Sequence, residues 1–140
     1  MNQIILASHG NMSAGMKDTV SMVFGDLPNL YVVATTRDEK ESVGIVTRRL
    51  LDGFQPEDQV FILTDVLGGS VNNEMMALLR EYPKVIVICG MNLSLVLNLA
   101  LAAEPLLPKT VEDMIAQARE QIINCTAMLK NAVEEEEDDL

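Results

Sequence analysis

The feature that most constrains the fold is a set of four short apolar runs, separated by longer stretches with helical periodicity. The runs cover residues 3–8, 30–34, 59–64 and 84–89, and their apolar residues are continuous instead of alternating with polar ones. Strands that are buried on both faces show this continuous pattern, and they occur mainly in parallel sheets. The sequence therefore predicts four parallel strands in the interior of the protein.

Helices are predicted between these strands and after the last one. The segments with helical spacing of apolar residues are 13–24, 39–51, 71–81, 93–103 and 111–129. Alternating strands and helices build a doubly wound α/β fold, because parallel strands are joined by crossover helices that pack on the sheet. We expect an open, mainly parallel sheet with strand order 2-1-3-4 and helices on both faces.

The C-terminal part of the chain combines a helix signal with a block of acids. Thr110 and Asp113 have the spacing of a capping box, which predicts that the last helix begins at residue 111. Residues 134–139 are all acidic. Like charges repel one another and bury no apolar surface, so residues 131–140 are predicted to form a disordered acidic tail. Residues 1–130 are predicted to form a single domain.

The composition excludes several classes of function. The chain has 10 Lys and Arg against 21 Asp and Glu, a formal net charge of −11, so it lacks the basic surface that nucleic acids require. The nucleotide motifs GxGxxG and GxxxxGK[ST] are missing, and one histidine without a cysteine pair does not suit zinc. We expect no cofactor, no metal and no nucleic-acid partner. Cys89 and Cys125 show no disulfide spacing, which fits a cytoplasmic protein.

Residues 85–103 carry no charge, and their length approaches the roughly 20 residues that span a bilayer as a helix. Polar residues and a glycine interrupt this segment. Its first part is β-branched and its second part is rich in Leu and Ala, which favours a strand followed by a helix.

Polar residues gather where the predicted strands end. The first strand ends at His9, and the third runs into Asp65, Gly68, Gly69 and Ser70. In the order 2-1-3-4 the first and third strands are neighbours, and open α/β sheets bind ligands beyond the carboxyl ends of the strands, where the strand order reverses. We therefore expect His9 and Asp65 to lie at the same edge of the sheet, close to the glycine loop.

These residue types suggest nucleophilic chemistry at a histidine. A neutral imidazole is a nucleophile near neutral pH, and a carboxylate at one ring nitrogen fixes the tautomer so that the other nitrogen faces the substrate. Asp65 is placed for that role beside His9. Tandem glycines, the amides of a helix N-terminus and the Ser70 hydroxyl together form an anion site. The combination indicates phosphoryl transfer through His9.

Each of these residues also has a plainer interpretation. His9 could be an isolated surface imidazole, and Asp65 could accept backbone amides ahead of a helix. The glycines could serve only a turn in which Ser70 is the N-cap. A triad of Ser70, His9 and Asp65 would indicate a hydrolase, but the nucleophile-elbow pattern GxSxG is missing.

The same residues carry a resemblance to a known family. The apolar first strand runs into Ser-His-Gly at residues 8–10, and the third strand is followed by D-x-x-G-G-S-x-x-N, from Asp65 to Asn73. With this spacing, the two motifs resemble the enzyme IIA domain of the mannose-type sugar phosphotransferase system. The resemblance extends over residues 1–130, which would be the phosphotransferase IIA domain.

The resemblance implies a histidine phosphocarrier. His9 would accept a phosphoryl group from the phosphocarrier protein HPr and pass it to a IIB protein, which serves the membrane subunits IIC and IID during sugar uptake. Asp65 would hold the imidazole, and Ser70 with the amides near Gly68 and Gly69 would bind the phosphoryl oxygens. No metal or nucleotide is implied.

The resemblance also implies a homodimer. Members of the family are dimeric, and the helix predicted over residues 93–103 is apolar on nearly all sides. A helix on the outside of a sheet normally keeps one polar face, so a contact with a second copy is expected to cover part of this helix.

The chain departs from the family pattern at two places. Leu67 and Val71 stand where members often carry an aromatic residue and a proline. Members also use a short late strand that is exchanged between subunits, whereas residues 111–129 are predicted here as helix. Two related functions stay open: a phosphoryl-relay domain for dihydroxyacetone kinase, and a regulatory domain that senses phosphorylation.

Overall fold

The computed structural model describes residues 1–38, 40–103 and 105–139. Its strands form one parallel sheet with the predicted order, β2-β1-β3-β4. The two central strands are β1 (Asn2–His9) and β3 (Gln59–Thr64). The two edge strands are β2 (Leu30–Thr35) and β4 (Ile86–Cys89). The predicted α/β class and strand order are therefore confirmed.

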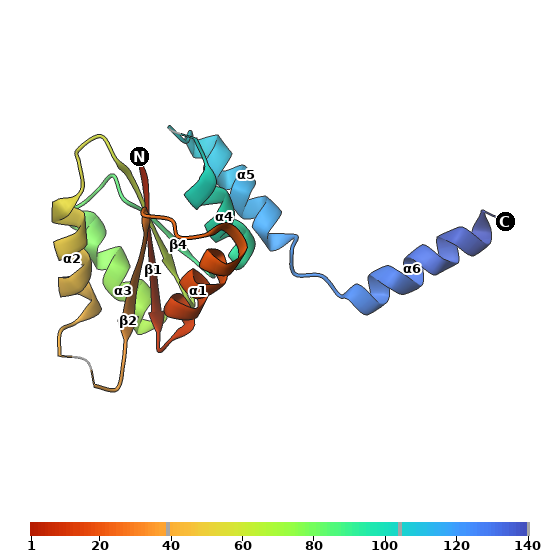
Figure 1. Ribbon diagram of the computed structural model, residues 1–140, viewed down its shortest axis with the longest axis horizontal. Coiled ribbons are helices and arrows are strands. Elements are labelled where there is room, and N and C mark those ends of the chain that lie inside the picture. Colours follow the sequence, from red (N-terminus) through yellow and green to blue (C-terminus); the bar gives the residue numbers. More distant parts are fainter. Residues whose placement is uncertain (39, 104, 140) are drawn as a thin grey trace.

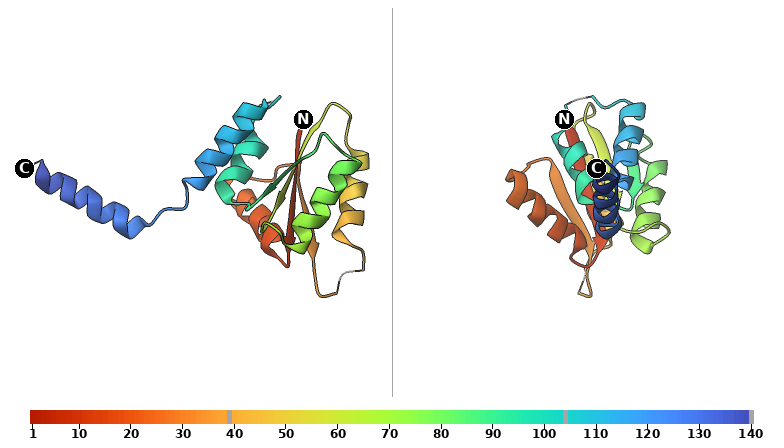
Figure 2. Two further views of the ribbon diagram at one scale, coloured as in Figure 1. Left: turned by 180° about the vertical axis from the view of Figure 1, so that it is seen from behind. Right: turned by 90° about the vertical axis from the view of Figure 1, so that its right-hand side faces the viewer.

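Helices cover both faces of this sheet (Figures 1 and 2). The helices on the first face are α1 (Met12–Phe24), α4 (Leu93–Leu101) and α5 (Pro108–Arg119). Those on the opposite face are α2 (Val43–Gly53) and α3 (Ser70–Ala77), with the short 3₁₀ turn η1 (Leu78–Arg80) after α3. The sheet is thus the middle layer of three.

The continuous apolar runs follow from this layering. Side chains along a strand point alternately to the two faces of a sheet. Ile4 and Leu6 of β1 pack in the core under α1, α4 and α5. Ile5 and Ala7 pack in the second core, against α2 and α3. Every β1 residue before His9 is buried, so this strand needs apolar side chains on both faces.

Several helix boundaries differ from the predicted ones. α2 begins at Val43, because the Ser42 side chain caps it by accepting from the backbone N–H of Ile45 at 3.2 Å. The predicted start of this helix, Glu39, lies outside the described residues. The third helix begins at Ser70 and tightens into η1 after Ala77, and α4 ends at Leu101 instead of residue 103.

The capping-box prediction at Thr110 was wrong. α5 begins at Pro108, whose fixed φ suits the first turn of a helix, so Thr110 lies inside the helix. The segment before Pro108 is held to the sheet by Gln59. The Gln59 side chain donates to the Leu106 carbonyl at 2.8 Å and accepts from the Leu106 amide at 2.7 Å. This tertiary contact holds the backbone just before the helix.

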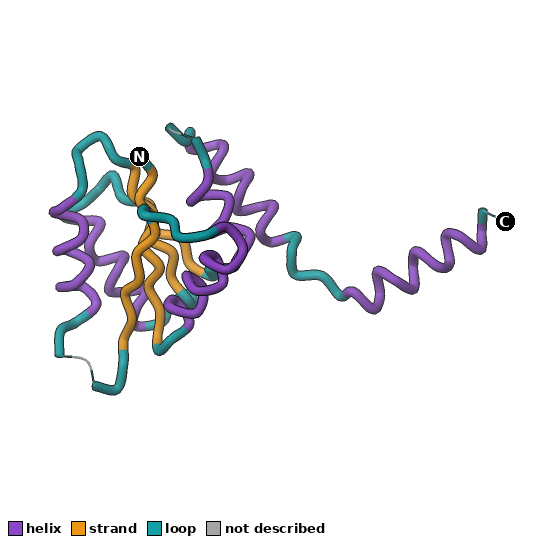
Figure 3. Tube along the Cα trace, in the orientation of Figure 1, coloured by secondary structure: helices purple, strands orange, loops and turns teal. Residues whose placement is uncertain are grey.

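The predicted continuous helix over residues 111–129 is two helices in the structure, α5 and α6 (Cys125–Asp138). The Asn92 side chain donates to the Ala118 carbonyl at 2.9 Å and so satisfies an acceptor near the end of α5. Asn124 begins the next helix by accepting from the Ala127 amide at 3.1 Å. Figure 3 shows the loop between the two helices leading away from the sheet.

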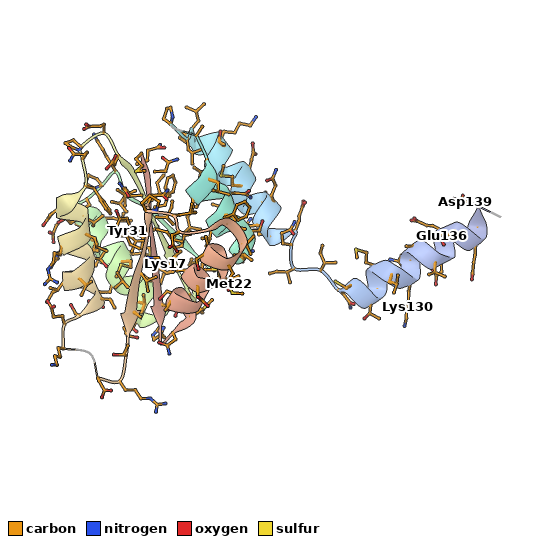
Figure 4. The ribbon with its side chains drawn as sticks, viewed as in Figure 1. Lys17, Met22, Tyr31, Lys130, Glu136 and Asp139 are labelled. Carbon is orange, nitrogen blue, oxygen red and sulfur yellow. The ribbon has the colours of Figure 1, made fainter. Side chains whose placement is uncertain are left out.

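Residues 131–138 of the predicted disordered tail belong to α6 and are helical. α6 lies wholly within the described residues and has no buried residue. Its Lys130 and Glu136 side chains, and that of Asp139, extend into open space (Figure 4). The physical reason for the helix is local: Ala, Met, Leu, Lys and Glu are strong helix formers, and Asn124 supplies the cap.

The uncharged segment 85–103 divides into the end of the sheet and α4. Leu95, Val96 and Leu99 of α4 are buried in the core that α5 also lines, while Leu101 remains 47% exposed. Part of the apolar surface of α4 is therefore covered within the chain itself. Among the described residues, no helix is both long enough and apolar enough to cross a membrane.

Removing α6 should leave the rest of the protein almost as stable as before, because no residue of this helix is buried. Truncation after Asn124 should change the free energy of unfolding by no more than about 0.5 kcal/mol. Thermal unfolding followed by circular dichroism would measure this change. Truncation after Val133 is the matched control, since it removes the acidic block and keeps the apolar half of α6. A fall in Tm of about 10 °C or more after the longer truncation would show that α6 packs on the body.

Candidate functional site

The predicted site residues meet at the carboxyl edge of the sheet. β1 and β3 are parallel neighbours, and Ala7 of β1 pairs with Thr64 at the end of β3. His9 therefore lies at the end of β1, and Asp65 is the first residue beyond β3. Adjacent parallel strands bring both side chains to the same place, as the sequence predicts.

One oxygen of the Asp65 carboxylate contacts both the ring and the backbone of His9. Oδ2 lies 2.7 Å from His9 Nδ1 and also accepts from the His9 backbone N–H at 2.8 Å. The other oxygen, Oδ1, accepts from the Val66 backbone N–H at 2.9 Å. The plainer interpretation of Asp65 as an acceptor of backbone amides is thus also realised. The same carboxylate binds two amides and the imidazole.

The second ring nitrogen faces Ser70. His9 Nε2 lies 2.9 Å from Ser70 Oγ. An ionised carboxylate can only accept, so the ring proton sits on Nδ1 and the Nε2 lone pair accepts the hydroxyl hydrogen of Ser70. The His9 side chain is 49% exposed and that of Asp65 only 10%. The imidazole is therefore accessible while its carboxylate partner is shielded.

The charge of Asp65 is favoured by its contacts in the folded state. Burial by itself raises the pKa of the Asp65 carboxyl, but hydrogen bonds from the backbone N–H and the imidazole of His9, and from the backbone N–H of Val66, outweigh it. The pKa of Asp65 consequently lies below its ordinary value of 3.8. The carboxylate is ionised at neutral pH and available to hold a protonated ring nitrogen.

The glycine loop closes tightly against the imidazole. Gly68 has φ +79°, a backbone conformation that side chains with a Cβ disfavour. A Cβ on Gly69 would lie 2.8 Å from Val66 Cγ1 and 3.5 Å from His9 Cε1. Gly69 is also the N-cap of α3, so the predicted alternative of Ser70 as N-cap is not realised. Ser70 is the first residue of α3 and directs its hydroxyl to the ring.

Two residues that shape the site belong to the sequence motifs, but no role was predicted for them. Asn73, noted only as part of a motif, donates from Nδ2 to the Gly68 carbonyl at 3.2 Å and so holds the loop. The buried Ser8 hydroxyl accepts from the Ser13 amide at 2.8 Å and fixes the start of α1 beside His9. The sequence signal for Ser8 was its position, because it directly precedes the candidate nucleophile His9.

The arrangement can present a nucleophilic nitrogen to an anion. The His9 side chain is 49% exposed and its Nδ1 partner is a shielded carboxylate. Ser70, whose hydroxyl lies 2.9 Å from Nε2, is the first residue of α3, and the first amides of a helix have no partner within it and attract anions. The order Ser70, His9, Asp65 also matches the hydrogen bonding of a hydrolase triad, so geometry alone does not separate the two chemistries. In the part of the chain that the structure describes, no group of three or more His, Cys, Asp or Glu could hold a metal ion.

Comparisons with known proteins decide the family. The family model described as "PTS system fructose IIA component" matches residues 3–119. The chain is 24% identical over 138 residues to the sorbose-specific EIIA component of the phosphotransferase system from Lacticaseibacillus casei, covering 96% of this chain and 99% of that protein. It is 29% identical over 99 residues to the sorbose-specific EIIA component from Klebsiella pneumoniae, covering 71% of this chain and 73% of that protein.

A solved structure agrees with these sequence matches. A phosphoenolpyruvate-dependent sugar phosphotransferase system permease from Klebsiella pneumoniae superposes with a TM-score of 0.81 at 28% identity, over 91% of this chain and 93% of that chain. The family match spans both strands that carry the site and all the helices through α5. This chain belongs to the mannose-type IIA family and is an EIIA component of the sugar phosphotransferase system.

Proposed function

We propose that this protein carries a phosphoryl group on Nε2 of His9, which it takes from HPr and passes to a IIB protein. The observation that carries the proposal is the imidazole held between Asp65 and Ser70, with 49% of its side chain exposed. A carrier needs a nucleophile that two partners can reach in turn. Family membership favours this reading over hydrolysis, because the EIIA component belongs to a phosphotransferase system.

The transfer step needs no proton movement at the reacting nitrogen. The Nε2 lone pair of His9 forms a bond to phosphorus while the bond between phosphorus and HPr breaks, and HPr leaves with the bonding electron pair. The proton on Nδ1 stays in place, so the phosphorylated ring becomes a cation. The Asp65 carboxylate, 2.7 Å from Nδ1, stabilises that cation. Transfer to the IIB protein reverses these steps.

The anion site would hold the phosphoryl oxygens after transfer. Ser70 Oγ lies 2.9 Å from Nε2, so its hydroxyl can turn from the nitrogen to an incoming oxygen. The first amides of α3 have no partner within the helix, and the helix dipole favours a negative charge there. Gly68 and Gly69 allow the backbone to approach without a side chain in the way.

The relay that we propose operates in the cytoplasm and feeds membrane IIC and IID subunits indirectly. We also propose that the chain forms a homodimer. Phe24 of α1, Leu97 and Leu101 of α4 and Met114 of α5 line a shallow, largely apolar hollow. Met22, two residues before Phe24 on α1, is 82% exposed; Figure 4 labels its side chain. A second copy would remove this surface from water.

Two other assignments share the same site chemistry. A relay to dihydroxyacetone kinase would differ in its acceptor, and a phosphorylation-sensing regulator would accept the group without passing it on. The three assignments therefore differ in which protein, if any, accepts the phosphoryl group from this chain. Incubation of the phosphorylated protein with candidate IIB proteins, and separately with dihydroxyacetone kinase, would assign the pathway.

Phosphorylated HPr should place one phosphoryl group on the protein, at His9. The label should be lost in acid and survive alkali, because a phosphoramidate hydrolyses readily when protonated. His9→Ala should abolish the label and leave the circular dichroism spectrum unchanged, since this imidazole packs no core. Mass spectrometry of the intact protein would measure the label.

Ser70 supplies the internal control, because a serine phosphate is stable in acid. His9 is the single histidine of the chain, so no other imidazole can carry the group. An acid-labile label that persists in His9→Ala, or an acid-stable label on Ser70, would contradict the proposal.

Asp65→Asn should keep the fold and slow phosphoryl transfer by roughly a hundredfold or more. An amide can select the other ring tautomer and has no charge to stabilise the phosphorylated imidazole. Rapid-quench measurement of transfer from phosphorylated HPr would give the rate. Asp58→Asn is a matched control, since Asp58 also accepts several hydrogen bonds. It lies at the opposite ends of the strands, just before β3 and beside the Met1 amine. Equal rates for wild type and Asp65→Asn would assign Asp65 to loop structure alone.

The same variant should change how stability depends on pH. The folded-state pKa of Asp65 is below 3.8, so its ionised form stabilises the fold above that pH, and the contribution is lost as the pH falls through the folded-state value. Asp65→Asn lacks this ionisation. The difference in free energy of unfolding between wild type and variant should therefore shrink as the pH decreases below 3.8. Urea titrations from pH 6 to about pH 2 would measure it. A constant difference would show that the carboxylate contacts are absent in solution.

The homodimer predicts a defined effect of charge in the apolar hollow. Leu101→Glu would bury an unpaired carboxylate at the contact and should convert dimer to monomer. Leu107→Glu is the matched control, because Leu107 is also exposed but does not line the hollow. Sedimentation equilibrium at micromolar concentration would report the mass. A monomeric wild type would remove the case for a dimer.

A further inference from the structure

A buried hydrogen bond closes the segment that carries both partners of His9. Thr64 Oγ1 donates to Asn72 Oδ1 at 2.7 Å, and the two residues have 0% and 2% of their surface exposed. Thr64 directly precedes Asp65, and Asn72 follows Ser70 by two positions. The bond therefore joins the residues that flank the carboxylate at Nδ1 and the hydroxyl at Nε2.

We propose that Thr64 and Asn72 are positioning residues that set the distance between Asp65 and Ser70, and thereby orient His9 for phosphoryl transfer. This inference rests on the function proposed above. The mechanism needs Nδ1 and Nε2 to have fixed and different partners. Both partners come from the short segment between the end of β3 and the first turn of α3, so closing that segment from inside fixes both at once.

The burial of this bond distinguishes it from the other contacts of the loop. Asn73 also bridges the loop, through the Gly68 carbonyl at 3.2 Å, but that contact is exposed to water. Water competes with an exposed hydrogen bond and not with a buried one, so the Thr64–Asn72 pair is the more rigid connection. The two side chains also depend on each other: if either one loses its polar group, the other is left buried without a hydrogen-bond partner.

Both ends of the connection are anchored. The Thr64 carbonyl accepts from the Met91 amide at 3.0 Å, which ties the end of β3 to the loop after β4. On the other side, Asn72 Nδ2 contacts Met76 Sδ at 3.5 Å, so the amide presents Oδ1 to the threonine. The segment that carries Asp65 and Ser70 is thus fixed to the sheet at its Thr64 end and to the first turn of α3 at its Asn72 end.

Thr64→Val tests the proposal, because valine keeps the shape of threonine and removes only the hydroxyl. With a single histidine in the chain, nitrogen-15 NMR reads the tautomer of His9 without overlap. We expect the wild type to show one tautomer with the proton on Nδ1, and Thr64→Val to show a mixture. Transfer from phosphorylated HPr should slow roughly ten- to a hundredfold in this variant, the effect typical of a reacting group displaced by about 1 Å.

Two further variants separate positioning from stability. Thr64→Ser keeps the hydroxyl and should restore both the single tautomer and most of the rate. Thr47→Val is the matched control: the Thr47 hydroxyl is also buried and also donates a 2.7 Å hydrogen bond, to the Val43 carbonyl in α2. It should leave the His9 spectrum and the transfer rate as in the wild type.

The double variant Thr64→Val with Asn72→Leu replaces both polar partners and removes the unpaired amide oxygen left by the single change. Its Tm should exceed that of Thr64→Val while its His9 tautomers stay mixed. A single wild-type tautomer in a folded Thr64→Val or double variant would overturn the positioning role. The NMR comparison does not depend on phosphoryl transfer. If phosphorylated HPr leaves the wild type without a phosphoryl group, the proposed function is refuted. The tautomer comparison would still decide whether this bond orients His9.

Discussion

The hydrogen bond between His9 Nδ1 and Asp65 Oδ2 depends on one constraint, the parallel pairing of β1 with β3. In this pairing Ala7 lies beside Thr64, so the residues that follow both strands emerge at the same edge. An antiparallel neighbour would place the two side chains at opposite ends of the sheet. Everything else at the site is arranged around this contact: the glycine loop, the start of α3 and the Ser70 hydroxyl.

The site combines an exposed nucleophile with a shielded partner. Half of the His9 side chain is open to solvent, while the Asp65 carboxylate is 10% exposed and accepts from two backbone amides as well as the ring. In the proposed relay this asymmetry is useful, because the imidazole must meet two different proteins without losing its orientation. The fold holds the carboxylate through the backbone amides of His9 and Val66.

The hydrogen bonding of His9 shows why a local geometry does not by itself identify a reaction. Ser70, His9 and Asp65 are linked in the order of a hydrolase triad, at 2.9 Å and 2.7 Å. What differs is which atom reacts. In a hydrolase triad the serine oxygen is the nucleophile and the imidazole is its base. In a phosphocarrier the imidazole nitrogen is itself the nucleophile. Family membership, which rests on residues 3–119, favours the carrier.

Sequence alone determined the α/β class, the strand positions and the pairing of His9 with Asp65. These follow from local rules: strands buried on both faces are continuously apolar, and parallel neighbours end together. The tertiary structure decided how the segment before α5 is held, because the Gln59 side chain bonds both backbone groups of Leu106. It also decided the partners of Thr64 and Asn72, which are eight residues apart along the chain and meet only when α3 packs on the sheet. Side-chain hydrogen bonds between elements have no periodicity, so a sequence pattern cannot reveal them.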